Sequence, residues 1–134
     1  MEFKRFYITN SEGKTNCVIR SFCKLYELNY DDVYNELVNI SKELNSESFN
    51  DIEVFEEFMK RRDTLKIEYD KDTKIKDLKL ENGKYIIFCY DKKDFYHMIT
   101  IIDNIIYDKS LDCLDLYTIS IYKQNILEKK QKRV

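Results

Sequence analysis

The sequence of 134 residues contains no proline, no alanine and no tryptophan, and it has only two glycines. Turns and helix caps therefore fall to asparagine and aspartate, whose short side chains bond to nearby backbone groups. The chain has 18 lysines against 5 arginines, a bias typical of an AT-rich genome, and we expect a bacterial or bacteriophage source. Histidine occurs once, at His97, so any histidine-dependent chemistry must use this residue.

Several protein classes are excluded by composition. The longest apolar run, at 85–90, has about six residues, whereas a membrane-spanning helix needs about 20. The first six residues carry charges where a signal peptide needs an apolar stretch. The formal charge of −2, from 23 basic and 25 acidic side chains, argues against nucleic-acid binding by phosphate neutralisation. With 43% hydrophobic residues for a core, we expect a single cytoplasmic domain over 1–134 with no membrane partner.

The first half of the chain has the pattern of three helices. We expect Asn16 to cap a helix that runs to about Tyr26, and Asn29 to precede a second helix. Asn50 and Glu53 have the spacing of a capping box for a third. The apolar residues expected on the three buried faces are Ile19, Phe22, Cys23 and Tyr26, then Val33, Leu37, Ile40 and Leu44, and finally Ile52, Phe55, Phe58 and Met59.

The second half is typical of β-strands. β-Branched and aromatic residues mark five segments, at 64–70, 85–90, 96–102, 105–108 and 114–123. In the first of these Leu65, Ile67 and Tyr69 alternate, which predicts a half-buried strand. Helices followed by consecutive strands predict an α+β fold, with N-terminal helices packed on a C-terminal antiparallel sheet of four to five strands. A basic tail from about residue 124 is interpreted as a frayed terminus; its charges are Lys129, Lys130, Lys132 and Arg133.

The four cysteines form no CxxC pair, and the chain has one histidine, so we expect no metal site and no cofactor. Reduced thiols are the default in the cytoplasm. Cys23 on an apolar helix face and Cys89 inside a strand are interpreted as small buried hydrophobes. Cys113 has no assigned role.

Cys17 differs from these three in its position, because it directly follows Asn16 at the start of the first helix. Free backbone N–H groups and the helix dipole lower the pKa of a thiol there and can also stabilise an oxyanion. The position alone fits either a catalytic nucleophile or a buried cysteine that happens to begin a helix.

His97 alone fits either a structural residue or a catalytic base, and the expected strand register supplies a partner for it. Residues 103–104 make a two-residue hairpin turn, which places Asp108 opposite Ile99. His97 and Asp108 are then diagonal neighbours on one face, within about 7–8 Å at the backbone. Asp103 shares that face, but it lies six residues along the strand, roughly 20 Å from His97. The register therefore selects Asp108.

Three segments carry a resemblance to a known family. TNCVIRSF at 15–22 and YDDVYNEL at 30–37 resemble the nucleophile helix and the following helix of small bacterial and phage papain-like cysteine peptidases. HMITIIDNIIYD at 97–108 resembles their histidine strand and acid strand. The resemblance covers about 15–112 and implies a papain-like fold. It also implies Cys17 as nucleophile, His97 as general base and acid, and Asp108 as the residue that orients the imidazole.

Two departures from the family pattern bear on activity. Papain-like enzymes generally have a side-chain oxyanion donor, often glutamine, several residues before the nucleophile, and here the first glutamine is Gln124. Asn10 and Asn16 are the available substitutes. The family often carries a tryptophan just after the acid, whereas Lys109 and Ser110 follow Asp108 here, so we expect an unshielded pair and a slow, selective or lapsed enzyme.

The expected function is that of a papain-like cysteine hydrolase that cleaves an amide, isopeptide or thioester bond in a peptide or protein substrate. The alternative is a catalytically weak or inactive binding protein on the same fold, such as a phage- or mobile-element-encoded inhibitor of a host complex. A separation too great for contact between Cys17 and His97 favours the alternative, and contact between them favours the enzyme.

Overall fold

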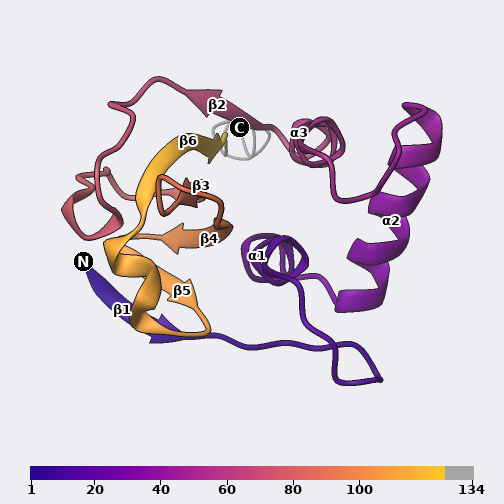
Figure 1. Ribbon diagram of the computed structural model, residues 1–134, viewed down its shortest axis with the longest axis horizontal. Coiled ribbons are helices and arrows are strands. Elements are labelled where there is room, and N and C mark those ends of the chain that lie inside the picture. The colour runs from indigo at the N-terminus through magenta and orange to yellow at the C-terminus, as the bar shows by residue number, and fades with distance from the viewer. Residues whose placement is uncertain (126–134) are drawn as a thin grey trace, which may run out of the picture.

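The computed structural model describes residues 1–125, in which three helices lie beside a twisted sheet (Figure 1). The helices are α1 (Cys17–Tyr26), α2 (Tyr30–Glu43) and α3 (Ile52–Lys60). The strands are β1 (Glu2–Arg5), β2 (Thr64–Ile67), β3 (Lys84–Tyr90), β4 (Tyr96–Ile102), β5 (Ile105–Asp108) and β6 (Tyr117–Gln124), with short 3₁₀ helices at Ile75–Asp77 and Leu111–Asp115. This confirms the α+β class. The predicted basic tail, with Lys129, Lys130, Lys132 and Arg133, lies outside the described residues.

Asparagine caps begin the first two helices, as the sequence predicts. The Asn16 side-chain oxygen accepts hydrogen bonds from two N–H groups of the first turn of α1, and Asn29 accepts one at the start of α2. The capping box at Asn50 was wrong, because the cap of α3 is Asp51 and its side chain makes no capping bond. The Asp51 carboxylate instead accepts a hydrogen bond from the hydroxyl of Ser46 in the preceding loop.

The buried faces follow the predicted periodicity except near element ends. Leu44 is 41% exposed because it is the C-cap of α2, where the helix ends. Ile52 is also 41% exposed, since it opens α3 and points away from the core, and Val54 is buried in its place. Leu65, predicted on a half-buried strand, is 58% exposed because β2 lies at the edge of the sheet.

The sheet has six strands in the order β1-β5-β4-β3-β6-β2, and it is mixed. The prediction of an antiparallel sheet of four to five strands was wrong, because β1 adds a sixth strand that pairs parallel with β5. A strand of four residues with only Phe3 partly buried has no alternation to reveal it. β2 ends at Ile67 rather than at residue 70, and β6 begins at Tyr117 rather than at residue 114 because a 3₁₀ helix precedes it.

The β4–β5 hairpin has the predicted register. Its turn residues Asp103 and Asn104 both have positive φ, 48° and 64°, as the mirror-image turns of two-residue hairpins require. Ile102 pairs with Ile105 and the next pair inward continues the same register. Asp108 therefore ends β5 beside the strand that carries His97.

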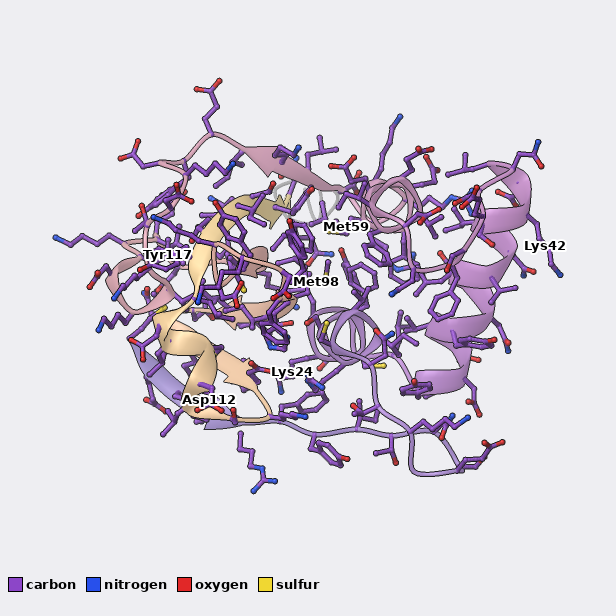
Figure 2. All side chains as sticks on the ribbon, in the orientation of Figure 1. Lys24, Lys42, Met59, Met98, Asp112 and Tyr117 are labelled. Carbon is purple, nitrogen blue, oxygen red and sulfur yellow. The ribbon has the colours of Figure 1, made fainter. Side chains whose placement is uncertain are left out.

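A layer of apolar side chains joins the helices to the sheet. Met59 of α3 and Met98 of β4, both labelled in Figure 2, belong to this layer. α1 is fixed on β4 by polar contacts as well: the Ser21 hydroxyl lies 3.0 Å from the Met98 carbonyl oxygen, and Thr100 Oγ1 donates to the Ser21 carbonyl at 2.9 Å. α1, which begins at Cys17, and β4, which carries His97, are thus held in one arrangement. Within residues 1–125, no helix is long and apolar enough to cross a membrane.

Candidate active site

Cys17 is the first residue of α1, where the backbone N–H groups of a helix are not used by the helix itself. The side-chain oxygen of Asn16 accepts from the N–H groups of Val18 and Ile19, at 2.9 and 3.1 Å. This cap fixes the first turn of the helix. All four cysteines are free thiols, and Cys17 is partly exposed whereas Cys23, Cys89 and Cys113 are buried.

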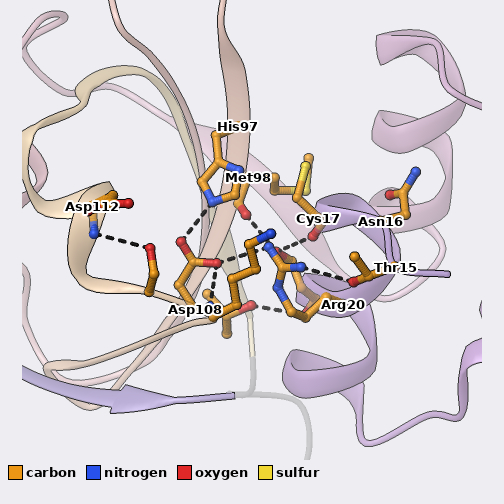
Figure 3. Close-up of polar contacts among 12 residues, drawn as sticks. Thr15, Asn16, Cys17, Arg20, His97, Met98, Asp108 and Asp112 are labelled. Carbon is orange, nitrogen blue, oxygen red and sulfur yellow. Dashed lines mark hydrogen bonds and ion pairs between the residues drawn. The ribbon is translucent and has the colours of Figure 1, made fainter. Parts of the chain in front are cut away.

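His97 and Asp108 are in direct contact, as the hairpin register predicts. Imidazole Nε2 lies 2.7 Å from carboxylate Oδ2, and Figure 3 shows this bond at the end of the hairpin. The other carboxylate oxygen, Oδ1, accepts from the Lys109 N–H at 2.8 Å. The His97 side chain is 11% exposed and that of Asp108 only 3%. The pair is therefore a buried, hydrogen-bonded unit.

The opposite side of the His97 ring faces Cys17. The Cys17 thiol interacts with His97 and with the backbone of Met98, and both interactions lower its pKa. Since Nε2 is occupied by Asp108, Nδ1 is the nitrogen available to Cys17. The structure thus brings together the three residues selected from the sequence, in the order thiol, imidazole, carboxylate.

The electrostatics of the three groups favour a thiolate beside an imidazolium. Burial acts to raise the pKa of Cys17, but the hydrogen bond and charge of His97, with smaller effects of Met98 N–H and Arg20, bring it below its ordinary value. Burial lowers the pKa of His97, yet bonds and charges from Asp108 and Cys17 outweigh it and raise the value to about 9. For Asp108, burial is outweighed chiefly by its bond to His97, and its pKa is lowered.

The other three thiols have the opposite shift. Burial raises the pKa of Cys23 to about 11 and that of Cys89 well above its ordinary value. The pKa of Cys113 is raised to about 12, first by burial and then by the nearby charge of Asp108. Because the thiolate is the reactive form, these three cysteines are expected to be inert.

Arg20, which the sequence did not single out, completes the site. Its Nη2 lies 2.9 Å from Asp108 Oδ1, and both side chains are almost fully buried, at 4% and 3% exposure. Its Nη1 donates to Thr15 Oγ1 at 3.2 Å. Arg20 lies one helical turn after Cys17, and that spacing is the only signal in the sequence that puts it near the site.

The two candidate oxyanion donors have different surroundings. The Asn10 side-chain oxygen accepts from the N–H groups of Glu12 and Lys14, so this residue closes a turn. Asn16 uses its oxygen as the α1 cap, and within residues 1–125 its amide nitrogen has no hydrogen-bond acceptor. Both line a hollow of about 490 Å³ at the N-terminal end of α1. None of Cys17, His97 and Asp108 lines this hollow, although Asn16 directly precedes Cys17 in the sequence.

The expectation of an unshielded His97–Asp108 pair was wrong. Phe95 stacks on the imidazole, with ring centroids 5.6 Å apart and planes 23° from parallel. A hollow of about 320 Å³ borders the pair and is also lined by Phe95, Cys113 and Leu116. Burial of both side chains and the stacking of Phe95, two residues before His97, thus shield the pair, although no tryptophan follows the acid.

Within the described residues no cluster of three or more histidine, cysteine or acidic side chains could hold a metal ion. Comparison of the chain with protein-family models, with curated proteins and with solved structures finds no match. A function is therefore inferred from the side chains of the site.

Proposed function

We propose that this chain is a papain-like cysteine hydrolase that cleaves an amide, isopeptide or thioester bond with Cys17, His97 and Asp108. The observation that carries the proposal is the His97 imidazole, which bonds the buried Asp108 carboxylate at 2.7 Å and whose interaction with the Cys17 thiol lowers the pKa of that thiol. A thiol whose pKa is lowered at a helix start, beside a protonated imidazole, is an activated nucleophile.

In the first step the Cys17 thiolate adds to the substrate carbonyl carbon, and the carbonyl π electrons move to oxygen. The Cys17 backbone N–H, at the helix start, is the donor suited to this oxyanion. The tetrahedral intermediate then collapses, the bond to the leaving group breaks, and His97 Nδ1–H gives that group its proton. The products are a thioester on Cys17 and a neutral leaving group.

In the second step neutral His97 takes a proton from water as the water oxygen adds to the thioester carbon. Collapse of this second intermediate expels the Cys17 thiolate and releases the acid, which restores the ion pair with His97. Asp108 keeps the ring in the tautomer and orientation that these transfers need.

The family assignment draws support from the order and packing of the elements. A helix that begins at the nucleophile packs on an antiparallel hairpin that carries first the base and then the acid. This is the layout that the sequence resemblance implies. The six-stranded mixed sheet, with its parallel edge strand β1, is compatible with that core arrangement.

Acylation by p-nitrophenyl acetate tests the proposal without knowledge of the substrate. We expect a burst of about one p-nitrophenolate per chain, with the acetyl group mapped to Cys17 by mass spectrometry. Cys17→Ala and His97→Ala should remove the burst while circular dichroism remains that of a folded chain. Cys23→Ala, which removes a buried thiol outside the triad, is the matched control and should keep it.

A burst that survives in Cys17→Ala, or an acetyl group on another cysteine, contradicts the proposal. Absence of any burst in the wild-type chain favours the non-enzymatic binding protein. In that case a biological effect of the chain should persist in Cys17→Ala.

A further inference from the structure

The buried guanidinium of Arg20 has no part in the bond-breaking steps, yet it contacts two parts of the site. It reaches from α1 to Asp108 at the end of β5 and to Thr15 in the loop before the nucleophile. Thr15 in turn donates its hydroxyl to the Ile8 carbonyl oxygen at 3.2 Å. Figure 3 shows Arg20 between Asp108 and Thr15. One side chain therefore ties the acid and the chain leading into Cys17 together.

Arg20 also determines which way the Asp108 carboxylate faces. Oδ1 accepts from Arg20 Nη2 at 2.9 Å and from the Lys109 N–H at 2.8 Å, which leaves Oδ2 for His97. Rotation of the carboxylate would break both bonds to Oδ1. Each oxygen therefore has its own donors, and the orientation of the imidazole follows from that division.

The permanent charge of Arg20 addresses a problem set by the chemistry. His97 must gain and lose a proton in each cycle, whereas Asp108 is buried and charged. If His97 were its only cationic partner, loss of the imidazolium proton would leave an unpaired buried carboxylate, which is costly. His97 would then hold its proton too tightly to act as a base. Arg20 stays charged throughout, so Asp108 keeps a partner in both states of the imidazole.

Arg62 also forms an ion pair, but it is more exposed than Arg20 and lies away from the site. Arg62, in the turn after α3, binds Glu36 of α2 through both of its terminal nitrogens, at 2.6 and 2.7 Å and away from the site. Its side chain is 23% exposed, against 4% for Arg20. Arg62 therefore offers a comparison in which an ion pair is lost without any change at the triad.

We propose that Arg20 is a positioning residue of the active site, which holds Asp108 ionised and correctly oriented while His97 exchanges its proton. This inference rests on the proposed hydrolase function. Arg20 acts through Asp108 and does not touch the reacting atoms.

Titration of the single histidine by NMR tests this role without turnover, because one imidazole Cε1–H resonance reports on one residue. Arg20→Met should raise the pKa of His97 by about one unit, since Asp108 then has no other cation. Arg20→Lys keeps the charge but cannot reach both partners, and it should give a smaller rise. Arg62→Met should lower stability and leave the His97 titration unchanged.

Hydrolysis of the acetyl group on Cys17 gives a second readout. In Arg20→Met it should be about tenfold slower near pH 7, with the midpoint of its pH dependence raised by the same unit, because less His97 is neutral. A folded Arg20→Met chain with an unchanged or lower His97 pKa contradicts the inference. If Arg20→Met does not fold, Arg20→Lys decides: a wild-type titration and a wild-type rate contradict the inference.

Failure of the inference can be told apart from failure of the hydrolase proposal. An acetylation burst at Cys17 with no shift in Arg20→Met leaves the enzyme proposal standing and removes the role of Arg20. If the wild-type chain gives no burst, the enzyme proposal fails, and a change in the His97 pKa in Arg20→Met then has no catalytic meaning. A burst together with the raised pKa supports both.

Discussion

Replacement of Asp108 by asparagine keeps the shape of the side chain and removes its charge, and the structure fixes how the amide must sit. Arg20 Nη2 and the Lys109 N–H both donate to Oδ1, so the amide oxygen must stay at that position. The amide NH₂ then faces His97 Nε2, which has to accept a hydrogen bond. The ring proton moves to Nδ1, toward Cys17, and the imidazole can no longer take a proton from the thiol.

Two effects of this substitution are large. Loss of the carboxylate leaves the buried Arg20 without a counter-charge, which costs about 3–5 kcal/mol in the free energy of unfolding. For a chain of this size the melting temperature should fall by roughly 11–18 °C. Acylation of Cys17 should slow on the order of 10⁴-fold, the effect of a wrong imidazole tautomer. The pKa of His97 should fall from about 9, because the bond and charge of Asp108 are chief among the effects that raise it.

Urea denaturation, p-nitrophenyl acetate kinetics and NMR titration of His97 measure the three effects in one variant. Asp115→Asn is the control, since Asp115 is 75% exposed in its ion pair with Lys76 and should change none of them appreciably. A folded Asp108→Asn chain that keeps the wild-type His97 pKa and acylation rate refutes the reasoning, because Asp108 then neither charges nor orients the imidazole.

Three further predictions concern pH, the docking of α1 and the cover of the imidazole. The lowered pKa of Cys17 makes stability rise with pH up to the ordinary pKa of a thiol, whereas the raised pKa of His97 makes stability fall with pH up to its folded value of about 9, so the two slopes should oppose each other in the wild-type chain. In Cys17→Ala only the His97 contribution remains. It is complete below the unfolded pKa of His97 and is lost as pH rises through the folded value, so urea denaturation should show the free energy of unfolding falling with pH. The same fall in the wild-type chain would contradict the ion pair. Ser21→Ala removes the hydroxyl that bridges α1 and β4, and it should lower the free energy of unfolding by about 1–2 kcal/mol and slow Cys17 acylation. Ser41→Ala, which removes a hydroxyl that bonds within α2, should affect stability alone. Phe95→Ala uncovers His97 and should slow acylation several-fold with little loss of stability in thermal melts, and an unchanged rate would mean that the ring is not a functional cover.

The parts of the fold that could be predicted are those with a local signal. Asn16 and Asn29 act as caps because their side chains bond to N–H groups two or three residues away. The hairpin register followed from a two-residue turn, and it was enough to select Asp108 as the partner of His97. Each of these inferences needed only neighbouring residues.

The parts that were missed depend on contacts distant in sequence. β1 is a strand because it pairs with β5, about 100 residues later. Its own residues are mostly exposed, so they show no apolar alternation from which a strand could be predicted. Arg20 occupied an ordinary polar position in a helix until the fold placed Asp108, 88 residues away, against it. The hollow beside the His97–Asp108 pair is lined by Phe95, Cys113 and Leu116, which no motif links.

Competition among the four cysteines for iodoacetamide, followed by peptide mapping, tests most directly whether the site holds an activated thiolate. At about pH 6.5 we expect Cys17 to be labelled at least 100-fold faster than the three buried thiols, because its pKa is lowered and theirs are raised. His97→Ala should abolish this preference. Equal and slow labelling of all four cysteines in the wild-type chain, or a preference that survives in His97→Ala, would contradict the Cys17–His97 ion pair.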